Sequence, residues 1–225
     1  MTKSTAPRKA ARTRRLPRRS HDSRATRKSL LAAAAKLFAA RGFDGASVAE
    51  VARQAGANKA LINYHFGGKL QLYRTILREM FMELLERVEP LRADPRPPDQ
   101  VLREFIAIVG DTANRRRAHL SKMMLREVIA GGPHLDHEVL VYPMRVFAVV
   151  REIIERGVRE RIFRPVDPIL THLSLVGSLV FFFATADFRS QIAAQAPIPL
   201  QATPPDAYVR HIQELIARGL AMEEA

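Results

Sequence analysis

The chain has 225 residues, of which 47% are hydrophobic and 26% charged, as is typical of a globular protein with one large or two modest domains. It has no Cys, which excludes disulfides, a thiolate nucleophile and a Cys-containing zinc site. The net charge of +13 points to an anionic partner, either nucleic acid or a membrane surface.

The net charge is confined to the first third of the chain. Residues 1–72 carry sixteen Lys and Arg against three Asp and Glu, whereas the residues after them carry twenty of each. We expect residues 1–21 to form a disordered basic arm, either a solvated tail or an arm that follows DNA phosphates, because they offer almost nothing apolar to bury. A transit peptide is an alternative, and the arm has no apolar stretch typical of a secretory signal.

Helical periodicity dominates the sequence, so we predict an all-α fold of about nine helices. Asp22 or Ser23 is a candidate N-cap of a first helix that ends at Gly42. Ser47 and Glu50 have the spacing of a capping box, which predicts a second helix that ends at Gly56.

The bounds of the next helices are predicted from candidate N-cap residues and from glycines and prolines that interrupt helices. Asn58 is a candidate cap of a third helix that runs to about residue 65, and Gly67-Gly68 precedes a long fourth helix from Lys69 to before Pro90. A proline-rich connection at 94–99 leads to further helices expected at about 99–113, 115–130, 138–162, 167–187 and 205–222. Residues 169–186 are uncharged and of borderline length for a membrane span, but their polar side chains favour a helix buried between protein surfaces, so no membrane partner is expected.

The second and third helices, joined by a tight turn at Gly56, form a predicted helix-turn-helix at 47–66. Val48, Val51, Ala52 and Ala55 make one apolar stripe that would pack on the first helix. In such motifs the second helix enters the major groove of DNA.

The segment SVAEVARQAGANKALINYHFGGKLQLY, preceded by AAKLFAARGFDGA, resembles the DNA-binding domain of the tetracycline-repressor (TetR) family over about residues 24–84. The resemblance implies an N-terminal three-helix DNA-binding domain at 22–68 and a larger helical effector-binding and dimerisation domain at 69–225. It also implies a cytoplasmic, nucleoid-associated bacterial homodimer that binds a palindromic operator in double-stranded DNA and is released by a small molecule. Leu61 and Gly67-Gly68 depart from the family pattern, which more often has polar residues there.

The resemblance assigns DNA contacts by position, and the chemistry of the side chains agrees. Contacts to the DNA backbone are expected from Ser47, Tyr64, His65 and Lys69. Base edges are expected to meet Lys59, Ala60 and Asn63, which suit guanine acceptors, a thymine methyl group and adenine respectively.

The neutral body is expected to dimerise and to hold the effector. Its uncharged helix and its last helix offer apolar faces for a four-helix bundle across a two-fold axis, with candidate interface residues Leu173, Val176, Gly177, Val180, Phe183, Ile212, Leu215 and Ile216. An effector pocket would be apolar with a few polar groups, and its candidates are Met123, Met124, Arg126, Glu127, Tyr142, Met144, Phe147, His172 and Phe182.

No cofactor is expected, and no catalytic motif is found. His134 and His137, with Asp136 and Glu138 nearby, are better explained as a polar loop than as a metal site. The sequence therefore favours a ligand-responsive repressor in which the fourth helix acts as a lever on recognition helices spaced about 34 to 36 Å apart. The alternatives are an architectural DNA-binding protein, or a small-molecule carrier or enzyme whose helix-turn-helix is only structural.

Overall fold

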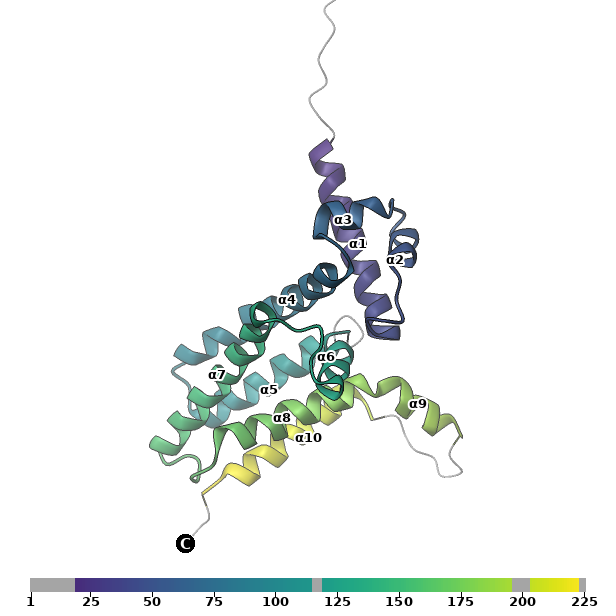
Figure 1. Cartoon of the computed structure of the whole chain (residues 1–225). Helices are drawn as coiled ribbons and strands as arrows, with labels where there is room; N and C mark the ends of the chain where they lie inside the picture. The colour runs from purple at the N-terminus through teal and green to yellow at the C-terminus, as the bar shows by residue number, and fades with distance from the viewer. Residues whose placement is uncertain (1–18, 115–118, 196–202, 223–225) are drawn as a thin grey trace, which may run out of the picture.

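The computed structural model describes residues 19–114, 119–195 and 203–222, and this part of the chain is built from helices without a strand (Figure 1). An all-α fold is therefore confirmed. The elements are α1 (Arg19–Arg41), α2 (Val48–Gln54), α3 (Ala60–Phe66), α4 (Lys69–Val88), a 3-10 helix η1 (Glu89–Ala93), α5 (Pro98–Asn114), α6 (His119–Ala130), α7 (His137–Arg159), α8 (Pro168–Ala184), α9 (Ala186–Gln195) and α10 (Pro205–Leu220).

The first helix begins earlier than its capping pattern predicts. Asp22 and Ser23, the candidate N-caps, lie inside α1, because α1 already begins at Arg19. Of the predicted basic arm, residues 19–21 belong to α1, and residues 1–18 lie outside the described residues.

The local signals of the helix-turn-helix are present as predicted. The Ser47 hydroxyl accepts a hydrogen bond from the Glu50 amide at 3.2 Å, while the Glu50 carboxylate accepts one from the Ser47 amide, which completes the capping box. Asn58 Oδ1 accepts from the Ala60 amide, the first of α3, at 2.9 Å, but the N-cap position is Lys59, one residue later than predicted. Gly56 has a φ of +64° in the turn, a conformation that costs glycine little.

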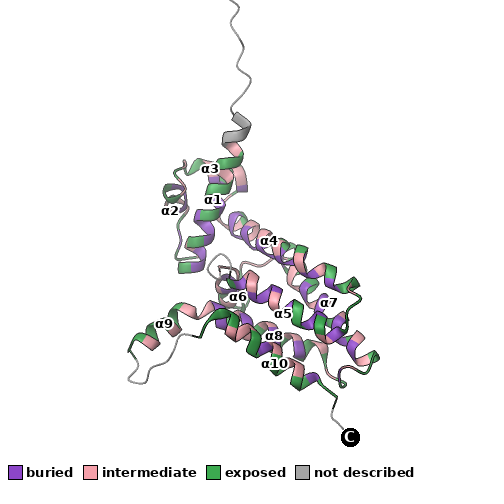
Figure 2. Cartoon of the chain, turned by 180° about the vertical axis from the view of Figure 1, so that it is seen from behind, coloured by how far each residue is buried: buried purple, intermediate pink, exposed green. Residues whose placement is uncertain are grey.

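Helix α4 runs through both hydrophobic cores of the molecule. Its first half, with Leu72, Tyr73 and Leu77, packs in the core of α1–α3, which also takes in Met123 of α6. Its second half, with Leu84 and Val88, packs in the body core of α5, α7, α8 and α10. The two cores therefore meet along one continuous helix, and Figure 2 shows buried residues on α4, α5, α7 and α8.

The predicted helix at 167–187 is instead two helices, α8 and α9, which meet at Thr185 with a bend of 58°. The break has a visible cause. Arg189 Nη1 donates to the Phe182 carbonyl, the group that the residue 186 amide would take in a continuing helix. Among the described helices, no single one is long and apolar enough to cross a membrane, and α8 and α9 reach that length and composition only as this bent pair.

A close approach in α7 yields the first testable prediction. A Cβ atom at Gly157 would lie 2.0 Å from a ring carbon of Phe163, whose side chain is buried. Gly157→Ala is therefore expected to lower the free energy of unfolding by about 2 kcal/mol, because the ring has no free space to enter. Urea denaturation measures this loss. Gly219→Ala in α10 is the control, since its Cβ meets open space, and an equal effect of the two substitutions would contradict the prediction.

Candidate functional site

Helix α3 has one buried and one exposed face. Ile62 and Phe66 point into the N-terminal core with exposed fractions of 1% and 9%. The opposite face carries Lys59, Ala60 and Asn63, all exposed. The residues predicted to meet base edges thus share the one surface of α3 that is open to a partner.

Tyr64 and His65 extend this surface toward the end of α3. Tyr64 is 79% exposed, and the rings of Tyr64 and His65 meet edge to face with centroids 5.0 Å apart. His65 is half-buried. The contact fixes the orientation of the Tyr64 ring, whose hydroxyl suits a phosphate or sugar oxygen.

Ser47 and Lys69 lie at the N-termini of α2 and α4 and already make contacts within the domain. The exposed Ser47 hydroxyl lies 3.0 Å from Glu50 Oε2. The Lys69 ammonium lies 4.3 Å above the ring of Phe43, a cation–π contact that orients the side chain.

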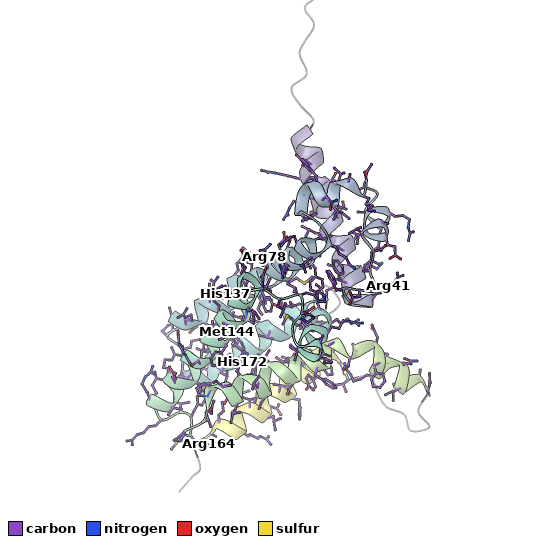
Figure 3. All side chains as sticks on the ribbon, in the orientation of Figure 1. Arg41, Arg78, His137, Met144, Arg164 and His172 are labelled. Atoms are coloured by element: carbon purple, nitrogen blue, oxygen red, sulfur yellow. The ribbon has the colours of Figure 1, made fainter. Side chains whose placement is uncertain are left out.

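Arg41 modifies the charge of this surface in a way that the sequence did not reveal. Its guanidinium lies 2.7 Å from the Glu50 carboxylate, and this hydrogen bond holds the pKa of Glu50 below its usual value. The carboxylate would repel phosphates, and the paired Arg41 cation offsets its charge. Figure 3 labels Arg41 at the end of α1.

A buried polar contact fastens the N-terminal core to the body. Glu127 of α6 is 3% exposed, and its Oε1 accepts from the Tyr73 hydroxyl at 2.8 Å and contacts His134 Nδ1 at 2.8 Å. Its Oε2 accepts from the His134 amide at 3.3 Å. Burial and the bond to Glu127 raise the pKa of Tyr73 well above its usual value, so the phenol remains a donor. We call Tyr73, Glu127 and His134 the Glu127 clasp.

The polar loop predicted at 134–138 is shorter in the structure, because α7 begins at His137, and His134 of this loop belongs to the Glu127 clasp. The His134 ring packs on Phe43 at a centroid distance of 4.0 Å, and its carbonyl accepts from Arg74. Asp136 caps α7 and pairs with Arg74 at 3.0 Å. Within the described ranges, no group of three His, Asp or Glu side chains is arranged to hold a metal ion.

A pocket of about 810 Å³ opens between α1 and the body. Residues of α1, α6, α8 and α9 line it, together with the end of α5 and the start of α10. Of the nine effector-pocket candidates, the structure places only Phe182 on its wall.

The other eight candidates lie outside this pocket and do not gather at one site. Met123 is fully buried in the N-terminal core, Glu127 belongs to the clasp, and Arg126 donates to the Ala40 carbonyl at 3.2 Å. Tyr142 stacks on Phe81, Phe147 packs against His172, Met124 packs at the margin of both cores, and Met144 is exposed. Figure 3 shows Met144 and His172 in the region of α7 and α8, away from α9. Burial lowers the pKa of His172, which favours its neutral form.

The predicted interface residues divide by exposure. Leu173, Gly177 and Leu215 are exposed, whereas Val176 and Ile216 pack at the edge of the body core and Val180 is half-buried. Phe183 and Ile212 are both 3% exposed. They belong to the core of a single chain and are not available to a partner.

Comparisons with known proteins agree with this geometry. Residues 30–76 match the family described as bacterial regulatory proteins, tetR family. The HTH-type transcriptional repressor NicS of Pseudomonas putida is 28% identical over 212 residues, which cover 92% of this chain and 98% of NicS.

Two solved structures share the fold. The TetR family transcriptional regulator PfmR from Thermus thermophilus has a TM-score of 0.68 and 24% identity, covering 86% of this chain and 99% of PfmR. AibR, solved in complex with isovaleryl coenzyme A and operator DNA, has a TM-score of 0.64 and 19% identity, covering 87% of this chain and 98% of AibR. With its helix-turn-helix, its second helical domain and these full-length relatives, the chain belongs to the TetR family of DNA-binding transcriptional regulators.

Proposed function

We propose that this protein is a homodimeric repressor that binds a palindromic operator and releases it when a small molecule binds the C-terminal domain. The observation that carries the proposal is the exposed face of α3, which presents Lys59, Ala60 and Asn63 to solvent. The opposite face is fixed in the core by Ile62 and Phe66. A helix held rigidly by its buried face and exposed along the other fits the major groove.

The chemistry of the side chains on this surface indicates which of them contact bases and which contact the DNA backbone. Lys59 and Asn63 are assigned to base edges, and Ala60 to a thymine methyl group. Ser47, Tyr64, His65 and Lys69 are assigned to phosphate and sugar, which set the register of the protein on the duplex. The basic segment at residues 1–18 is assigned a sequence-independent contribution to affinity.

The exposed apolar side chains of α8 and α10 support a dimer. Leu170, Leu173 and Phe181 of α8 are 61–64% exposed, and Leu215 of α10 is 56% exposed. Residues 170, 173, 177 and 181 fall on one face of α8, and Gly177 on that face allows close helix approach. Two copies joined there would present two recognition helices to successive major grooves.

Leu173→Glu tests this interface. It is expected to raise the dimer dissociation constant by about 100-fold, because it places two unpaired carboxylates in an apolar contact. Sedimentation velocity of the full chain measures the change. Val128→Glu is the control, since Val128 is also exposed, at 70%, but lies on α6. A dimer that tolerates Leu173→Glu as well as Val128→Glu would place the interface elsewhere.

Release by a ligand is supported by the continuity of α4 through both cores and by the complex of AibR with isovaleryl coenzyme A and operator DNA. A ligand shifts operator affinity only if it binds the two arrangements of the domains differently. We propose that operator binding and release take place in the bacterial cytoplasm, the compartment that contains the chromosome.

Whether the protein represses or activates is tested with a reporter gene whose promoter contains a DNA sequence that the protein selects. Repression predicts that expression falls when the protein is produced and recovers when the effector is added. Increased expression would make the protein an activator. Unchanged expression despite tight duplex binding would favour an architectural role.

A further inference from the structure

The pocket between α1 and the body is rich in cationic side chains. Lys36 of α1, Lys122 of α6 and Arg189 of α9 line it, while Ala39 and Phe183 give it apolar wall. Lys36 and Ala39 lie in the second half of α1, and Figure 1 shows α9 below the C-terminal end of that helix. The pocket therefore lies where the DNA-binding domain meets the body.

Several contacts hold the Arg189 side chain in place. Its guanidinium lies 3.8 Å above the ring of Phe182, and its Nη1 donates to the Phe182 carbonyl and, at 2.8 Å, to Thr185 Oγ1. The ring of Tyr208 stacks on Phe182 with centroids 3.8 Å apart and planes within 4°. The side chain is thus fixed before any ligand arrives, which lowers the entropy cost of binding.

The charge of Arg189 has no carboxylate partner within the described ranges. The acidic side chain of the pocket wall, Asp187, pairs with Lys122 at 2.6 Å. Arg189 is half-buried, so its charge is partly removed from water, and this burial lowers its pKa. An unpaired cation in such a position gains free energy from an added anion.

We propose that this pocket binds a small organic anion with an apolar body, whose carboxylate or phosphate is held by the remaining donors of Arg189, with Lys36 as a second cation. The planar guanidinium matches either oxyanion. The inference rests on the proposed function, because it gives that regulator its effector site and the chemical class of the effector.

The position of the pocket explains how such a ligand would act on DNA binding. Lys36, Ala39 and Ala40 belong to α1 of the DNA-binding domain, and Arg189 belongs to the body. A molecule that contacts both parts favours one arrangement of the two domains over others. By linkage, operator DNA then changes the affinity for the anion by the same factor.

Calorimetric titration of the full chain with octanoate, octyl phosphate and 1-octanol tests the site. The three probes share one apolar chain and differ in the head group. At least one of the two anions is expected to bind about tenfold more tightly than the alcohol, and the preferred anion distinguishes a carboxylate from a phosphate effector. Equal affinity for all three probes, or no binding of either anion, would overturn the proposal.

Arg189→Met is expected to weaken the preferred anion about tenfold and to leave the alcohol unchanged. Arg151→Met is the matched control, because Arg151 is an exposed cation on α7 outside the pocket, paired with Glu155. Lys36→Met is a second variant, expected to weaken the anion several-fold whether or not Arg189→Met folds. Unaltered anion affinity in a folded Arg189→Met or in Lys36→Met would contradict the assignment.

Duplex binding by the same samples separates the site from the proposed function. If the protein selects a DNA sequence but ignores both anions, the site fails and the regulator stands. If it binds the anion through Arg189 but selects no duplex, the regulator fails and the site stands.

Discussion

Glu127→Ala is expected to lower the free energy of unfolding by about 3 kcal/mol. The substitution deletes a buried acceptor and leaves the Tyr73 hydroxyl and the His134 amide without the partner that satisfies them. Glu127→Gln keeps an oxygen for Tyr73 and is expected to cost about 1 kcal/mol. Urea denaturation at one fixed protein concentration measures both losses, because dimerisation adds a concentration-dependent term.

Glu138→Ala is the matched control for this prediction. Glu138 also pairs across elements, with Arg78 at 2.7 Å, but its side chain is 74% exposed, so its loss is expected to cost less than about 1 kcal/mol. Figure 3 labels Arg78 beside His137, the residue that precedes Glu138. Equal destabilisation by Glu127→Ala and Glu138→Ala would show that the clasp does not hold the two domains together.

The double variant Lys59→Ala with Asn63→Ala is expected to lower affinity for the preferred duplex by about 100-fold or more, since each base contact contributes about 1 to 3 kcal/mol. Affinity for unrelated duplexes is expected to fall much less, because phosphate contacts remain. Fluorescence anisotropy with the two kinds of duplex at one salt concentration measures the ratio.

The control for the double variant is Arg151→Ala, which removes one positive charge at a site away from α3. It is expected to leave both affinities unchanged. If the double variant loses the same affinity on preferred and unrelated duplexes, Lys59 and Asn63 contact the backbone and not the bases.

The parts of the fold that sequence reasoning predicts are those fixed by near neighbours in the chain. The capping box of Ser47 and Glu50 joins residues three positions apart, and the hydrogen bond from the Ala60 amide to Asn58 at the start of α3 joins residues two apart. The exposed face of α3 follows from helical spacing once Ile62 and Phe66 are recognised as core. Such signals need no knowledge of the tertiary structure.

The parts that sequence reasoning misses depend on contacts between distant elements. Tyr73 and Glu127 are 54 positions apart, and Glu127 has no local feature that identifies a buried carboxylate. The bend between α8 and α9 depends on Arg189 reaching a carbonyl of the preceding turn. Periodicity predicts Phe183 in the dimer interface although it is buried in the core, because α8 is apolar on more than one face and periodicity does not distinguish its core side from its open side.

Selection of bound sequences from random duplex DNA by the full-length protein, at two salt concentrations, tests most directly whether α3 reads DNA sequence as part of a dimer. We expect a palindromic consensus whose half-sites lie about one helical turn apart or a multiple of it, enriched at both salt concentrations. Binding without enrichment, lost steeply as salt rises, would contradict a sequence-specific regulator and leave only electrostatic attachment to DNA.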